Sequence, residues 1–137
     1  MKIYIGPKNL EDKSYKCISD VSILEYVSED SECNLIVLDG VFRKNNIDKY
    51  SEIVQLVCKK LRINGTLIVV DIDFDLLTYA YSKIGNIQEL NKSVFTTDIQ
   101  SFLTYDILLN IFQSVSNVSL VKSSMQNIEF NMEFVKK

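Results

Sequence analysis

Two apolar segments separated by an amphipathic one constrain the fold of this chain more than any other feature. Residues 33–38 and 66–70 are each mostly aliphatic, which is typical of strands that are covered on both faces. Between them, apolar residues recur at steps of three and four along residues 47–61, which predicts a helix with one apolar stripe. Asn64 and Gly65 close that helix as a turn in which we expect glycine to take a positive φ. The pattern predicts a right-handed β-α-β unit in a parallel sheet.

Two shorter strands are predicted ahead of this unit. Residues 2–5 alternate in polarity and are rich in β-forming types, and Gly6 with the proline after it ends them. Residues 8–15 are polar and are expected to form a loop. A second strand is predicted at residues 16–19, followed by Asp20, a residue type that often begins helices.

The C-terminal half changes from helical to alternating periodicity. Residues 73–84 are expected to be helical, and Thr104 has the position of an N-cap for a further helix. Residues 118–121 then form a predicted strand, with a turn at 125–127. Apolar residues alternate strictly with polar ones over 128–134, which predicts an antiparallel final strand and a C-terminal hairpin on an otherwise parallel sheet.

Length, composition and charge narrow the class of protein. The 137 residues are 47% hydrophobic and 24% charged, which is the composition of one globular domain spanning 1–137. The net charge is −3 and the pI about 5.0, without a block of like charges. We therefore expect no nucleic-acid partner and no association with an anionic membrane, since both require clustered lysine and arginine.

The histidine and cysteine content limits the chemistry. The chain has no histidine, so Ser-His and Cys-His catalytic pairs and histidine-ligated zinc are excluded. Cys17, Cys33 and Cys58 lack the CxxC spacing of a metal or redox motif. We expect reduced thiols, no metal and a cytoplasmic location, or a virion if the protein is encoded by a phage.

Residues 17–74 resemble the class I S-adenosylmethionine (SAM) dependent methyltransferases, and in particular small bacterial and phage members. In that family an aspartate opens a short helix, as Asp20 does here, and the motifs that follow match CNLI at 33–36, KLRINGTL at 60–67 and DIDF at 71–74. The resemblance implies an α/β, reduced Rossmann-like methyltransferase fold with a mostly parallel sheet and an antiparallel C-terminal strand.

The same resemblance implies where SAM would bind. Gly6 corresponds to the glycine-rich cofactor turn, and Asp20 to the residue that accepts a hydrogen bond from the adenine. Asp39 follows a strand at its carboxyl end, where open α/β sheets bind ligands. Each has a structural alternative: a strand-ending turn for Gly6, a helix N-cap for Asp20 and a turn-forming Asp-Gly pair for Asp39.

Departures from the family pattern decide the functional hypothesis. Only Gly6 remains of the glycine turn, and Pro7 cannot donate a backbone hydrogen bond. The acidic ribose-binding strand and its preceding helix are missing, and residues 41–44 lack the glutamate and histidine of the subfamily. We expect a domain that has lost SAM binding and acts as a protein-interaction or structural module, which would be part of the virion if the protein is encoded by a phage. The alternative is a minimal SAM-dependent methyltransferase that works by proximity.

Two further hypotheses concern surfaces and metals. The missing strand and helix predict a contact with a protein partner or a second copy around residues near the N-terminus, which are Ile3, Tyr4, Ile18, Ile23 and Tyr26. Clustered carboxylates favour, less strongly, a Mg²⁺ site like that of haloacid dehalogenase-type phosphatases, at Asp71, Asp73 and Asp75.

Overall fold

A computed structural model describes residues 1–84, 88, 91–92, 99–115 and 117–137. The described residues form one six-stranded sheet with the strand order β2-β1-β3-β4-β6-β5. Strands β2, β1, β3 and β4 are parallel, and β6 is antiparallel to both of its neighbours. The strands are β1 (Lys2–Ile5), β2 (Tyr15–Ile18), β3 (Cys33–Asp39), β4 (Leu61–Ile72), β5 (Val118–Gln126) and β6 (Glu129–Lys136).

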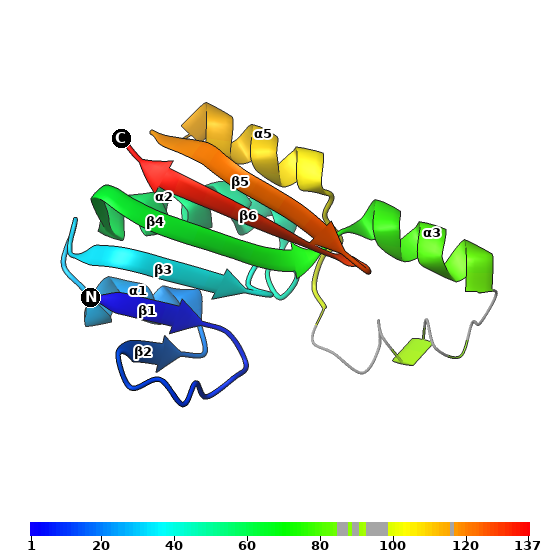
Figure 1. The fold of residues 1–137 in the computed structure, drawn as a ribbon, viewed down its shortest axis with the longest axis horizontal. Helices are drawn as coiled ribbons and strands as arrows, with labels where there is room; N and C mark the ends of the chain where they lie inside the picture. Colours follow the sequence, from blue (N-terminus) through cyan, green and yellow to red (C-terminus); the bar gives the residue numbers. More distant parts are fainter. Residues whose placement is uncertain (85–87, 89–90, 93–98, 116) are drawn as a thin grey trace.

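Helices cover one face of this sheet. Helices α1, α2 and α5 lie together on that face, whereas α3 extends away from the sheet beyond the end of β4 (Figure 1). The helical segments are η1 (Val21–Ile23), α1 (Leu24–Val27), η2 (Ile47–Lys49), α2 (Tyr50–Lys60), α3 (Phe74–Ile84) and α5 (Tyr105–Val115).

The predicted β-α-β unit is present as β3, α2 and β4, with the two strands parallel. The predicted turn at 64–65 is wrong, because α2 ends at Lys60 and β4 starts at the next residue. Asn64, not Gly65, has the positive φ, at 64°. Gly65 is required by close approach instead, since a Cβ there would lie 2.8 Å from the Arg62 carbonyl and 3.0 Å from the Cys33 carbonyl.

The predicted C-terminal hairpin is confirmed, with its turn displaced. Strand β5 continues to Gln126, so the chain reverses at Asn127 and Ile128 rather than over 125–127. Asn127 takes the left-handed conformation that such a tight reversal needs, with φ of 58°. Strand β6 inserts between β4 and β5 and places Phe130 and Phe134 in the core.

The N-terminal strands and the N-caps also follow the sequence pattern. β1 and β2 are parallel neighbours joined by residues 6–14, which contain no helix. Asp20 caps η1 through its side chain. Thr104 precedes α5, and its Oγ1 accepts a hydrogen bond from the Ile107 amide at 3.3 Å, which satisfies one free donor of the first turn.

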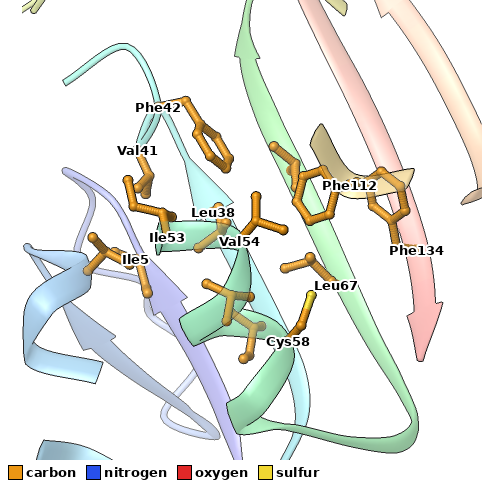
Figure 2. Packing of buried hydrophobic residues seen from close by; sticks show 14 of the residues in the cluster. Ile5, Leu38, Val41, Phe42, Ile53, Val54, Cys58, Leu67, Phe112 and Phe134 are labelled. Atoms are coloured by element: carbon orange, nitrogen blue, oxygen red, sulfur yellow. The ribbon is translucent and has the colours of Figure 1, made fainter. Parts of the chain in front are cut away.

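The core lies between the sheet and α1, α2 and α5. Side chains of α2 pack on Leu38 and Leu67 of the central strands, and Phe42 and Phe112 close the same layer (Figure 2). The rings of Phe112 and Phe134 stack with centroids 4.4 Å apart. This face supplies the apolar burial that stabilises the domain.

The opposite face of the sheet carries no helix among the described residues (Figure 1). Its centre consists of half-buried aliphatic side chains, which we name the open face: Leu35, Val37, Ile68, Val70 and Ile72. Val37 lies beside Ile68 in the register of β3 and β4, so these side chains shield one another without a covering layer.

Candidate functional site

A cleft of about 290 Å³ opens at the carboxyl ends of β1, β2 and β3. This volume is at the lower end of the range of about 300–1,000 Å³ for small-molecule sites. The structure brings the three predicted site residues, Gly6, Asp20 and Asp39, together in this cleft. The complete lining is Gly6, Ser19, Asp20, Val21, Asp39, Val41, Lys44, Asn45 and Gln100.

Gly6 is needed for space at the base of the cleft. A Cβ on Gly6 would lie 2.6 Å from the Tyr4 hydroxyl and 2.9 Å from Cβ of Asp39. Its own amide donates to the Ile18 carbonyl at 3.2 Å, and Pro7 has no amide hydrogen. The first two positions of this turn therefore have no free backbone donor for a ligand.

Tyr4 and Asp39 form a part-buried pair that the sequence did not reveal. The Tyr4 hydroxyl donates to Asp39 Oδ2 at 2.6 Å, and Tyr4 is only 4% exposed. Burial and the Asp39 carboxylate raise the pKa of Tyr4 above its usual value, so the hydroxyl stays protonated and continues to donate. The acidic group at the end of β3 thus has a partner within the chain.

Asp20 is the N-cap of η1, which is one of the two roles that the sequence suggested for it. Its Oδ1 accepts hydrogen bonds from the amide and the hydroxyl of Ser22, both at 2.9 Å. The side chain is exposed at the mouth of the cleft. Asp20 lines the same cleft as Gly6, and its hydrogen bonds are those of a cap.

A buried ion pair behind the cleft shapes the loop after β3. Asp71 is fully buried, and its Oδ2 accepts the amides of Phe42 at 3.1 Å and Arg43 at 3.3 Å. Arg43 Nη1 lies 3.5 Å from Asp71 Oδ1. Burial raises the pKa of Asp71 to about 6, although Arg43 opposes the shift.

The absence of a side chain at Gly40 leaves the space that the Arg43 guanidinium occupies. Gly40 takes a positive φ of 73°, and a Cβ there would lie 2.7 Å from Arg43 Nη2. The segment beginning at Gln100 is attached to the same loop, because the amides of Gln100 and Ser101 donate to the Arg43 carbonyl at 2.7 and 3.2 Å. The ion pair therefore positions Lys44, Asn45 and Gln100 on the wall of the cleft.

Two of the three carboxylates proposed for Mg²⁺, those of Asp71 and Asp73, accept backbone hydrogen bonds instead, and Asp75 is exposed. Asp73 Oδ2 accepts the Leu76 amide at 2.9 Å, and Oδ1 accepts the Tyr105 amide at 2.7 Å. Asp73 thereby begins α3 and anchors the start of α5, while Asp71 holds the loop after β3. In the part of the chain that the structure describes, no three acidic, cysteine or histidine residues form a metal-binding group.

Two of the five residues predicted to make a contact near the N-terminus do not lie at the surface. Ile3 and Tyr4 are buried, because Ile3 faces the helices and Tyr4 lies beneath Gly6. Tyr26 is 89% exposed, and Ile23 is also exposed.

Among the helices that the structure describes, none has the length and hydropathy to cross a membrane.

Comparison with known proteins identifies the fold. No family model and no curated protein matches the chain. A SAM-dependent methyltransferase from Methanosarcina mazei has a similar structure, with 12% identity and a TM-score of 0.62 over 89% of this chain and 66% of that one. One from Archaeoglobus fulgidus has 8% identity and a TM-score of 0.63 over 98% and 75%.

A third similar structure is magnesium protoporphyrin IX methyltransferase from Synechocystis with bound SAH, at 12% identity and a TM-score of 0.58 over 90% of this chain and 51% of that one. The chain is thus shorter than all three proteins. Its fold is that of the class I SAM-dependent methyltransferases, reduced to a mostly parallel sheet with two antiparallel C-terminal strand pairings, as the sequence predicted.

Proposed function

We propose that this chain is a methyltransferase-like module that has lost SAM binding and acts by binding another protein chain. The observation that carries the proposal is the internal pairing of the polar groups in the cleft. The Gly6 amide is bonded to Ile18, Asp39 to Tyr4, and Asp20 to Ser22. The Gly6 amide has one hydrogen and cannot bind a ligand while it is bonded to Ile18, and at Asp39 and Asp20 a ligand would share the carboxylate with the partner already present.

The open face supports the interaction role. Parallel sheets normally have both faces covered, and an apolar patch on a soluble protein often marks a binding surface. Leu35, Val37 and Ile68 form the middle of such a patch here. A partner chain that covers it would supply the missing layer.

Calorimetric titration with SAM tests the first half of the proposal. We expect no saturable heat up to about millimolar SAM, where binding is worth only about −4 kcal/mol. Tyr4→Phe is the informative variant, because it removes the hydroxyl that occupies Asp39 and leaves the buried ring in place. If Tyr4→Phe bound SAM more tightly than the wild type, the Tyr4–Asp39 hydrogen bond would be what prevents SAM from binding. Micromolar binding by the wild type, weakened by Asp20→Ala and unchanged by Ser119→Ala on β5, would overturn the proposal.

A minimal SAM-dependent methyltransferase is the second candidate. The specific observation in its favour is that Gly6, Asp20 and Asp39 converge on one cleft at the carboxyl ends of parallel strands, the position where open α/β sheets bind ligands. In that case Gly6 and Asp20 would seat SAM, and positioning of the substrate would supply the rate enhancement. The calorimetric result with wild-type protein separates the two candidates.

A further inference from the structure

The outer edge of β5 is long and has no partner among the strands that the structure describes. β5 is an end strand of nine residues that pairs only with β6, whereas the other end strand, β2, has four residues. Every residue from Val121 to Gln126 is exposed. Val121 is 56% exposed and Met125 is 52% exposed. Such an edge presents backbone N–H and C=O groups that a further strand can pair with.

Beyond the register shift of β5, this edge has little protection against strand pairing. β5 contains no proline, and Lys122 is its one charged residue. Lys122 lies opposite Glu133, a residue of opposite charge, on the neighbouring β6. A register shift between Leu120 and Lys122 separates the first part of the strand, which packs near α5, from the exposed part. The exposed part is therefore the segment available for pairing.

The sequence of this segment fits a second copy of itself. In an antiparallel pair about a two-fold axis at Ser123, Val121 lies opposite Met125 of the second copy, and Lys122 lies opposite Ser124. Both exposed apolar side chains then acquire an apolar cross-strand neighbour, which stabilises strand pairs. An axis at Lys122 would place two lysines together, and one at Ser124 would leave Val121 without an apolar neighbour.

We propose that two copies of the chain pair their β5 strands about Ser123 and form one sheet that continues across the dimer. The inference rests on the interaction role in the proposed function and names its surface and its partner. It leaves the open face of each copy accessible. A two-fold axis makes the contact self-complementary and closes the assembly at two chains.

Light scattering after size-exclusion chromatography tests the dimer with the full chain. We expect a mass of twice 15.8 kDa. Met125→Lys places a charge opposite Val121 of the second copy and should weaken the dimer at least tenfold. The double variant Val121→Lys/Met125→Lys places two lysines opposite each other and should be a monomer. Ile63→Lys, at a 66% exposed site on β4, is the matched control and should leave the dimer unchanged. Circular dichroism and melting confirm that each variant is folded.

A cysteine on the axis provides the second measurement. Ser123→Cys in a Cys17→Ser background should form an intermolecular disulfide when oxidised glutathione is added, because residues facing each other across an antiparallel pair lie at disulfide distance. Gln126→Cys, which has no self-partner in this register, should not. Monomeric wild type, a dimer that survives the lysine variants, or equal cross-linking at both sites would overturn the proposal. If wild-type monomer bound a different protein, the proposed function would stand and only this edge would be rejected.

Discussion

The two faces of the sheet use similar residues for different purposes. Along β4, Leu67 and Val69 point toward the helices and are completely buried, while Ile68 and Val70 between them belong to the half-buried open face. The continuous apolar run predicted a strand covered on both sides. Among the described residues, helices cover one side only. The comparison teaches that hydrophobicity at the open face is a surface property that the packing of the described residues does not explain.

Substitution of neighbouring residues on β4 should show the largest difference between the faces. Leu67→Ala removes a fully buried side chain and should lower the free energy of unfolding by about 2–5 kcal/mol. Ile68→Ala on the open face should cost less than half as much in the isolated chain, because part of that side chain is already hydrated. Urea unfolding of both variants measures this. Equal losses would mean that the open face is covered.

The buried carboxyl on the helix-covered side should make stability depend on pH. The pKa of Asp71 rises from 3.8 to about 6 on folding, so the folded state binds this proton more tightly than the unfolded state. The contribution is fully present below about pH 4 and is lost as the pH rises through 6. It amounts to at most about 3 kcal/mol.

Urea unfolding at several pH values, with Asp71→Asn as the reference, measures this contribution. The wild type should lose stability relative to the variant between pH 4 and 7, because asparagine does not ionise. Parallel pH profiles for the two proteins would refute the assignment. Asn keeps one carbonyl oxygen that can accept the amides of the loop after β3.

Gly6→Ala, at the base of the cleft, should lower the free energy of unfolding by an intermediate amount. The added methyl group would lie 2.6 Å from the Tyr4 hydroxyl, so it must displace the hydrogen bond to Asp39. We expect a loss of about 1–3 kcal/mol, as for other overpacked sites. Ser19→Ala, in the same cleft, is the control and should change stability by less than about 0.5 kcal/mol. Thermal unfolding of both variants measures these changes. If Gly6→Ala left stability unchanged, Tyr4 would have room to move.

The smallest effect is expected for a polar substitution on the open face. Val70→Thr keeps the β-branched shape and adds a hydroxyl that water can reach, so stability should change by less than about 1 kcal/mol. Val69→Thr on the covered face is its matched control and should cost more, because its hydroxyl is buried. If Val70→Thr proved the more damaging of the two, the distinction between the faces would be refuted.

Local patterns in the sequence predicted most of the fold. They did not predict which polar side chains pair with one another. The hairpin and the β-α-β unit repeat a periodicity that fixes which side chains face inward. The gathering of Gly6, Asp20 and Asp39 followed from a topological rule about strand ends. The Tyr4–Asp39 bond joins residues 35 positions apart, and no spacing in the sequence encodes such a contact. The start of β4 was missed because Asn64 and Gly65 are turn-forming residue types, whereas here they lie inside the strand, where Asn64 has a positive φ.

The position of β6 has a consequence for how the chain folds during synthesis. β6 is translated after every other strand, yet it pairs with β4 on one side and β5 on the other. Until it emerges from the ribosome, one edge of β4 lacks its partner, and Phe130, Met132 and Phe134 are missing from the core. The sheet can therefore be completed only after this strand has been synthesised. During that interval β4 is the aliphatic edge most exposed to pairing with other nascent chains.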